Sequence, residues 1–340
     1  MDAANILGQA ALDAHAIAAK TDMEADAIAR HLRALSNVHI FNEVSPNVFK
    51  NNEASLLLQQ ESAKALVGLG AEEGRMSCYK QWEALSGKRS GQTGFNLAYQ
   101  TDLSVYDYWK QVRPDWGQRA ARAFSSNVGN LEQYLALYPW AKEPDGALVV
   151  DVGGGIGGAT LPIIKRFTNL KLQVQDREEN GLEFIKHLEN DFPTVAASHR
   201  ASFIEQDFFQ PNKTPRADVY FMRHILHNWP DASAKALLGK LSAAMSPSSK
   251  LLLCEHVVYP AYRDVEGRGE MDEAVAPEPL LANWGDVYTS RMDVMMLAAL
   301  GARERSRREV EALVGGVGLV VWRVWRNMGT EAIVECRLCE

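Results

Sequence analysis

The fold is decided by residues 149–158, Val-Val-Asp-Val-Gly-Gly-Gly-Ile-Gly-Gly. The apolar run predicts a strand, and the glycines predict a tight turn into a helix, where a bulky ligand can touch the backbone. A G-x-G-x-x-G pattern begins at Gly153, and Asp176 follows at about the interval known from dinucleotide sites. However, Asp151 at the strand end would repel a phosphate and suits a cation. The spacing therefore predicts a nucleotide-type site without naming its ligand.

The chain has 340 residues, 46% of them hydrophobic, and a formal net charge of −7. This length allows one large α/β domain plus a smaller one. An acidic balance argues against nucleic acid or an anionic membrane as partner, because both are bound through clustered Lys and Arg. There is no secretory leader and no charge-free run of 18 residues, so we expect a cytoplasmic protein with a small-molecule partner.

The four cysteines do not predict a disulfide framework in a chain of this length. Cys336 and Cys339 form a C-x-x-C pattern, but no second ligand pair accompanies it. Structural zinc needs four ligands, so we interpret this pair as part of a terminal strand.

From Ala147 onward, the pattern alternates between strands and helices. The candidate strands are 147–151, 171–175, 201–205, 217–222, 250–256, 318–325 and 331–337, and the helical patterns include 157–166, 180–190, 231–245 and 288–300. This alternation predicts an α/β fold with a Rossmann-like, doubly wound, seven-stranded sheet. Ligands of such folds bind beyond the carboxyl ends of the strands.

The N-terminal part predicts a smaller, mainly helical domain. Residues 23–36 have apolar positions at helical spacing, and 38–50 alternate around the turn signal at Ser45–Asn47. Helix followed by hairpin is typical of a winged helix. The charges of that helix are mixed, so we favour an interaction and lid role over DNA binding. Amphipathic stretches at 104–112 and 118–137 are expected to link the two domains, 1–110 and 111–340.

Three further motifs follow the glycine turn, namely Val-Gln-Asp (174–176), Glu-Gln-Asp-Phe-Phe (205–209) and Arg-His-Ile-Leu-His-Asn-Trp-Pro-Asp (223–231). In this combination, the chain from about residue 20 to 340 resembles the class I S-adenosylmethionine-dependent O-methyltransferases of the fungal and plant small-molecule type, which carry an N-terminal winged-helix domain. The resemblance implies S-adenosyl-L-methionine as cofactor, S-adenosyl-L-homocysteine as product and a homodimer. Family members commonly have several dozen residues before the position of residue 10, so the shorter N-terminus leaves dimer formation open.

The cofactor would lie against the glycine turn, where a missing Cβ permits close approach. The resemblance implies that the turn contacts the methionine moiety, that an acid and its neighbour after the third strand flank the adenine, and that an arginine after the fourth strand meets the cofactor's carboxylate or carbonyl. An acid at the end of the second strand can accept both ribose hydroxyls. The glycines of the turn are Gly153 and Gly154, and the pair that would flank the adenine is Asp207 and Phe208. The arginine is Arg223, and the acid at the end of the second strand is Asp176.

The candidate general base is His227. Methyl transfer to a hydroxyl requires removal of its proton, and a phenol with a pKa near ~10 is mostly protonated at neutral pH. An imidazole is suited to take that proton. His224 and His256 are rivals, but His227 matches the family's catalytic position. Glu255 and Glu304 match family acids that flank this histidine, although Glu304 also fits a solvated, charged helix start.

No acid-and-amide cluster of the magnesium-dependent type stands at the corresponding strand ends, so no metal is expected. Asp231 is interpreted as the N-cap of the following helix. The resemblance places Phe95, Tyr99 and Met296 in the wall of the acceptor pocket, while apolar residues at helical spacing are equally compatible with plain core.

Together these features predict O-methylation of a hydroxyl on an aromatic or polyketide-like secondary metabolite. One alternative keeps the cofactor but uses its positive charge for dehydration or a pericyclic rearrangement. A second is a non-enzymatic regulator that binds DNA through the winged helix. The intact set of His227, Glu255 and Glu304 favours methyl transfer.

Overall fold

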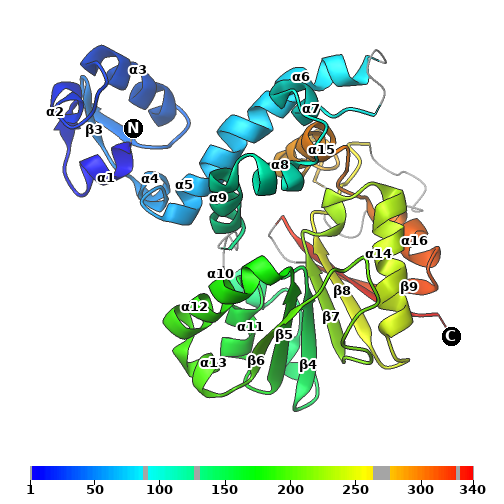
Figure 1. Ribbon diagram of the computed structural model, residues 1–340. Coiled ribbons are helices and arrows are strands. Elements are labelled where there is room, and N and C mark those ends of the chain that lie inside the picture. The colour runs from blue at the N-terminus through cyan, green and yellow to red at the C-terminus, as the bar shows by residue number, and fades with distance from the viewer. Residues whose placement is uncertain (1, 87–90, 126–130, 263–275, 327–329, 340) are drawn as a thin grey trace. The chain divides into compact units, whose positions relative to one another are not determined.

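The computed structural model describes residues 2–86, 91–125, 131–262, 276–326 and 330–339. The chain forms two compact units, drawn in Figure 1. Unit 1 consists of Met1–Leu69 with Gln118–Asn127, and unit 2 of Gly70–Gly117 with Val128–Glu340. The predicted division at residue 110 concerns the roles of the parts. It stays a prediction, because compactness alone assigns no role.

Unit 1 contains the predicted helix and hairpin. Its elements are α1 Ala3–Leu7, β1 Leu12–Asp13, α2 Ala14–Ala18, α3 Ala25–Ser36, β2 Asn42–Ser45, β3 Val48–Lys50, α4 Glu53–Leu57 and α5 Glu61–Leu69. The strands pair antiparallel in the order β1-β3-β2, and Asn47 turns the hairpin with a φ of 61°. The apolar face of α3 buries Ile28 and Leu32 against Phe49. On its other face, Arg33 binds Glu43 of the hairpin, so this cation is already neutralised within the fold.

Unit 2 is built on the predicted sheet. Within the described residues, seven strands pair in the order β6-β5-β4-β7-β8-β10-β9. They are β4 Ala147–Val152, β5 Leu170–Asp176, β6 Ala201–Glu205, β7 Val219–Arg223, β8 Lys250–Glu255, β9 Leu319–Arg326 and β10 Ala332–Leu338. The five strands β4 to β8 run parallel to one another, while β10 is antiparallel to both β8 and β9. The strand order reverses between β5 and β7 at β4, so the expected ligand position lies at the carboxyl end of β4.

Helices cover both faces of this sheet (Figure 1). On one face lie α10 Leu131–Leu135, α11 Leu161–Arg166, α12 Gly181–Asp191 and α13 Pro193–Ala197, and on the other α14 Asp231–Ala244 and α16 Arg307–Gly315. Along β4, Val149 faces the first group of helices and Val150 and Val152 face the second. Because both faces are buried, the parallel strands are continuous apolar runs rather than alternating ones.

A separate group of helices completes unit 2. It comprises η1 Gly70–Gly74, α6 Arg75–Leu85, α7 Gly94–Tyr99, α8 Val105–Gln111 and α15 Val287–Leu300, with short turns η2 Trp140–Lys142, η3 Glu178–Asn180 and η4 Leu226–Asn228 elsewhere in the unit. Helix α9, Pro114–Ser125, begins in unit 2 and continues into unit 1. A Cβ on Gly94 would lie 2.1 Å from the carbonyl oxygen of Ser77, so α6 and α7 pack at backbone contact.

Some predicted boundaries were wrong for a local physical reason. The helix expected from residue 157 begins at Leu161, because Gly155 and Gly157 have φ of 58° and 78° and cannot continue a right-handed helix. Asp231 is not an N-cap: Pro230 occupies that position, and Asp231 is the first helical residue. The stretch 118–137 is covered by the end of α9 and by α10, with residues 126–130 outside the described part. Residues 263–275, between β8 and α15, also lie outside it.

Among the described residues, no helix is both long and apolar enough to cross a bilayer. The C-x-x-C pattern lies at the end of the sheet, with Cys336 buried in β10 and Cys339 exposed behind it, and both thiols are free.

Candidate active site

The glycine bend after β4 provides the ligand-facing backbone. Gly153 has a φ of 75°, a left-handed conformation that other residues adopt at a cost. A Cβ on Gly154 would lie 2.3 Å from the carboxylate of Asp151, so this position has no room for a side chain. At Gly155, in contrast, a Cβ would meet nothing within 4 Å. The bend therefore packs tightly against the sheet and opens outward at Gly155.

Acidic side chains flank the bend. Asp151 is buried, accepts a hydrogen bond from Thr160 Oγ1 at 2.6 Å, and burial raises its pKa to about 7. Asp176, at the end of β5, accepts hydrogen bonds from the N–H groups of Gly155 and Arg177, both at 2.7 Å, and from Asn180 Nδ2 at 2.9 Å. A carboxylate has about four acceptor positions, so it can hold both ribose hydroxyls of a nucleoside if one of these contacts gives way.

Aromatic rings lie beside the same bend, after β6. The ring of Phe208 is 3.5 Å from the position a Cβ on Gly153 would take, and it packs edge-on against Phe209 and Trp229. Tyr106 of α8 stacks on Trp229. Asp207 is exposed and accepts a hydrogen bond from the N–H of Phe209 at 2.9 Å. The position predicted for an adenine is thus bordered by the exposed carboxylate of Asp207 and by the edge of an aromatic cluster.

Arg223, at the end of β7, is held by an acid of the same chain. Its Nε donates to Glu331 Oε1 at 2.9 Å and its Nη2 lies 2.5 Å from the same oxygen. The guanidinium also lies over the ring of Tyr134. Glu331 carries a pKa of about 2: burial opposes ionisation, but His224 and Arg223 outweigh it. Sequence analysis missed Glu331, since nothing in the sequence near β10 signals a partner 108 residues away.

His227 occupies the turn η4 just past β7. Its Nδ1 lies 2.7 Å from Glu304 Oε1, and both residues are buried. A carboxylate can only accept, so Nδ1 carries the proton and Nε2 keeps a lone pair. Burial alone would lower the pKa of His227, but the hydrogen bond and charge of Glu304 outweigh it and the net shift is upward. Glu304 is therefore not a solvated helix start.

Glu255 contacts the backbone of this turn. Its Oε1 accepts hydrogen bonds from the N–H groups of Ile225 at 3.1 Å and Leu226 at 2.9 Å. Burial raises the pKa of Glu255 to about 7, with the charge of Glu304 acting in the same direction. The structure thus brings together the three residues predicted to be catalytic, and within that group Glu255 anchors the segment that carries His227.

Arg305 is the second anchor of the turn, and sequence analysis missed it. Its side chain is buried and donates to the carbonyl oxygens of Leu226 at 2.9 Å and Trp229 at 2.8 Å, and to Asp231 Oδ1 at 2.8 and 3.0 Å. Both ends of η4 are therefore clamped by one guanidinium. The sequence held one signal for Arg305: it directly follows Glu304, so burying Glu304 at the site also brings Arg305 close to the turn η4.

A ligand atom from each of His227, Glu255 and Glu304 lies within 4.8 Å of the others. Such a spacing suits a metal ion, and it equally suits an imidazole held beside two carboxyl groups. The expectation of a metal-free site therefore stays a prediction.

The residues predicted to wall the acceptor pocket come from α7 and α15. Helix α15 contacts both α7 and η4, so it connects these residues to the turn of His227. Met296 is buried on α15, and Phe95 is only 1% exposed and packs on Tyr99 with ring centroids 4.8 Å apart. Phe95, Tyr99 and Met296 all stay predicted pocket residues.

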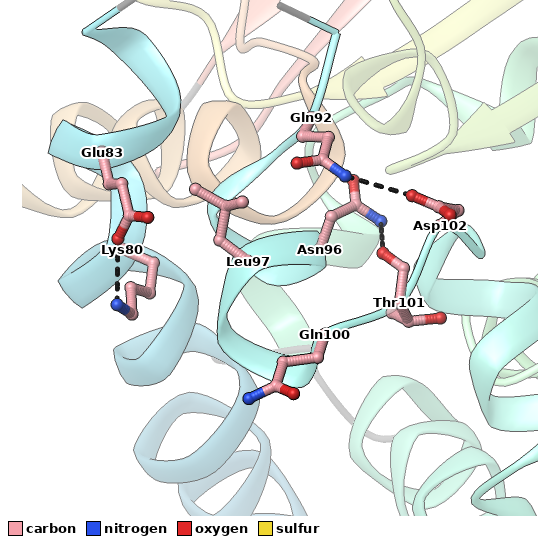
Figure 2. Close-up of a pocket in the computed structure, with 8 residues that line it drawn as sticks. All are labelled: Lys80, Glu83, Gln92, Asn96, Leu97, Gln100, Thr101 and Asp102. Atoms are coloured by element: carbon pink, nitrogen blue, oxygen red, sulfur yellow. Dashed lines mark hydrogen bonds and ion pairs between the residues drawn. The ribbon is translucent and has the colours of Figure 1, made fainter. Parts of the chain in front are cut away.

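A polar cavity of about 470 Å³ is lined by residues of α6, α7 and the segments on either side of α7, and none of the predicted site residues lines it. Figure 2 shows that its side chains bond to one another: Gln92 to Asp102, Asn96 to the carbonyl of Thr101, and Lys80 to Glu83. These polar side chains are thus paired with groups of the cavity itself, and none of His227, Glu255 and Glu304 is among its lining residues.

Comparison with known proteins decides the family. A family model described as an O-methyltransferase domain matches residues 144–320. The chain belongs to the O-methyltransferase family. A "3-O-methyltransferase 2" of Phanerochaete chrysosporium is 32% identical to this methyltransferase. The match covers 94% of the present chain and 72% of the relative.

Solved structures agree on the fold. The O-methyltransferase NcsB1 from neocarzinostatin biosynthesis, in complex with S-adenosyl-L-homocysteine and 1,4-dihydroxy-2-naphthoic acid, superposes with a TM-score of 0.70 at 23% identity, covering 99% of this methyltransferase and 92% of NcsB1. A structure described as a pericyclic reaction enzyme superposes with a TM-score of 0.77 at 20% identity, covering 98% of this methyltransferase and 82% of that enzyme. At such identities, the likeness shows a shared fold and leaves the reaction to the site.

Proposed function

We propose that this chain transfers a methyl group from S-adenosyl-L-methionine to a hydroxyl of an aromatic or polyketide-like acceptor, with His227 as general base. The observation that carries the proposal is the buried contact between His227 Nδ1 and Glu304 at 2.7 Å, placed at the carboxyl edge of the sheet. It fixes one tautomer and leaves Nε2 as the only basic ring atom. The relative from Phanerochaete chrysosporium and the solved NcsB1 are both named O-methyltransferases, which supports the reaction type.

The residues at the glycine bend fit the cofactor. Gly155 faces open space, and the carboxylate of Asp176 stands beside it where a ribose would lie. When bound, S-adenosyl-L-methionine supplies an electrophilic methyl group on a positively charged sulfur. Nearby acids, unlike the basic residues of a phosphate site, suit such a charge.

The proton of the acceptor hydroxyl would pass to His227 Nε2 as its oxygen attacks the methyl carbon. The imidazolium that forms is stabilised by Glu304, whose Oε2 is buried and has no hydrogen-bond partner in the described part of the chain. Glu255 and Arg305 hold the backbone of η4, so the ring keeps its position while the proton moves.

A labelling experiment separates the proposed function from rearrangement chemistry. The protein is incubated with methyl-labelled S-adenosyl-L-methionine and a panel of phenols, and products are analysed by mass. Label in the product, with S-adenosyl-L-homocysteine in equal amount, is the expected result. Turnover to an unlabelled isomer or dehydrated product would replace the proposal by the pericyclic alternative. The same assay in excess chelator should keep its full rate, whereas loss of rate restored by a divalent ion would contradict a metal-free site.

We also propose that the active form is a homodimer. The support is a set of exposed apolar side chains on α6 and α15, two helices that contact each other: Tyr79 is 75%, Trp82 82% and Val287 56% exposed. Monomers rarely expose large contiguous apolar patches. Sedimentation should give twice the monomer mass, and Trp82→Glu should shift it toward the monomer.

A cytoplasmic location is proposed from the free thiols, which suit a reducing compartment. A fluorescent fusion excluded from the cytoplasm would contradict this location.

A further inference from the structure

His224 is the feature that the proposed reaction does not use. It lies between β7 and η4 with a φ of 54°, in the left-handed region. Its N–H donates to the carbonyl of Cys254 at 3.1 Å, and its own carbonyl accepts from Asn228 Nδ2 at 2.9 Å. Strained backbone of this kind persists where its surroundings hold it, and it clusters at functional sites.

The ring of His224 lies beside that of His227. Their centroids are 5.2 Å apart, and the side chain of His224 is 17% exposed against 9% for His227. On its other side, the ring is backed by His256 at 4.6 Å, which is buried and whose Nδ1 lies 3.1 Å from the carbonyl of Thr330. His224 is thus the more open of the two imidazoles at the reacting position.

Glu331 determines which nitrogen of His224 carries the proton. Nε2 lies 2.8 Å from Glu331 Oε1, a close contact between the two groups whose direction is outside the range of a hydrogen bond. A lone pair at that distance from a carboxylate oxygen would be repelled, so the proton resides on Nε2 and Nδ1 keeps its lone pair. In the described part of the chain, Nδ1 has no hydrogen-bond partner.

His224 is also unable to compete as a base. Burial and the positive charge of Arg223 lower its pKa to about 3, so it is neutral at any working pH. What it offers a ligand is a fixed acceptor for one hydrogen bond, next to the ring that removes a proton.

We infer that His224 determines specificity: its Nδ1 accepts a hydrogen bond from a second hydroxyl adjacent to the one that His227 deprotonates, so the preferred acceptor is an aromatic ring system with two neighbouring hydroxyls. This inference rests on the proposed methyl transfer. Neighbouring oxygens can each reach one of two rings 5.2 Å apart through O–H···N bonds of about 2.8 Å. Glu331 is then a positioning residue, acting through the tautomer of His224.

The test compares diols with matched monophenols. The probes are 2,3-dihydroxynaphthalene and 1,8-dihydroxynaphthalene against 2-naphthol and 1-naphthol. For the wild type, we expect kcat/KM to be about tenfold higher for each diol than for its naphthol, the worth of one good hydrogen bond. Two equivalent hydroxyls alone would give about twofold. The dissociation constants of all four, measured by calorimetry with S-adenosyl-L-homocysteine present, should show the same order.

Two variants at this position separate recognition from packing. His224→Phe keeps an aromatic ring without an acceptor, and the diol preference should fall to the statistical factor. His224→Asn keeps an oxygen near the place of Nδ1 and tolerates a left-handed backbone, so the preference should survive. Strain in the Phe variant lowers the rates for diol and naphthol together, so the ratio remains readable, and thermal unfolding records the strain itself.

Glu331→Gln tests the positioning role. Nitrogen chemical shifts of labelled His224 should report a single Nε2–H tautomer in the wild type and a mixture in the variant, with a weaker diol preference. Equal binding of diols and naphthols to the wild type, or an unchanged ratio in His224→Phe, would overturn the inference. If diols bind preferentially but no probe is methylated, the proposed reaction is contradicted, whereas recognition of diols by His224 is still supported.

Discussion

At the scale of single residues, the chemistry depends on opposing influences on one imidazole. Burial disfavours the charged ring of His227, while the hydrogen bond and charge of Glu304 favour it, and the second influence wins. The pKa of the free enzyme's base is therefore above the ordinary value for histidine. A stronger base accepts a proton more readily, but a larger share of it is already protonated at neutral pH.

This balance predicts a pH profile. The base must be unprotonated, so kcat/KM should rise with pH up to the raised pKa of His227 and level off above it. Glu304→Gln removes the charge that raises the pKa, so the break should move to lower pH and the plateau should fall. Initial rates between pH 5 and 10 check this. A break that stays in place in the variant would show that another group controls the rate.

Glu255 is predicted to act by its position rather than by its charge. Since its pKa of about 7 leaves much of it neutral under assay conditions, Glu255→Gln should keep kcat within a few-fold, because an amide oxygen can still accept the N–H groups of Ile225 and Leu226. Glu255→Leu leaves both donors buried without an acceptor, which costs about 1–3 kcal/mol each. Steady-state rates and urea unfolding distinguish the two variants. Equal loss in both would assign the carboxylate charge a direct catalytic role.

At the scale of elements, the turn η4 depends on a side chain from a distant segment. Arg305 donates to backbone oxygens at both ends of the turn, and Asp231 neutralises it. Arg305→Ala should lower the free energy of unfolding by about 2–4 kcal/mol, because buried carbonyls lose their donors. It should also lower kcat, since His227 loses its fixed position. Chemical denaturation and steady-state kinetics provide the measurement.

The matched control is Arg303→Ala, two residues away. Arg303 is 47% exposed and pairs with Glu309 at the surface, so its removal should cost no more than about 1 kcal/mol. Similar losses in both variants would mean that the clamp on η4 contributes nothing beyond a surface ion pair.

The strands were the most predictable elements. Short apolar runs such as 251–254 are typical of strands buried on both faces of a sheet, and all the predicted strands were confirmed to within about two residues. Helix starts were less predictable. The beginning of α11 at Leu161 depends on left-handed glycines, whose conformation is set by the bend rather than by helix propensity.

At the scale of the whole molecule, the sequence indicated which residues gather at the sheet's carboxyl edge, because strand ends and family motifs locate His227, Asp176 and the glycine bend. It did not indicate Arg305 and Glu331. Their partners lie 74 to 108 residues away, and a charged residue at the start of a strand or helix usually faces solvent. Only the pairing of β10 beside β8 brings Glu331 to Arg223.

The central claim is that His227 removes the acceptor's proton during methyl transfer, and single-turnover methylation by His227→Ala tests it most directly. With cofactor and acceptor both saturating, the rate of methyl transfer should fall by about 10²–10⁴-fold, while cofactor affinity measured by calorimetry stays within a few-fold. His187→Ala, on the outer helix α12, should match the wild type. An unchanged single-turnover rate in His227→Ala would contradict the claim.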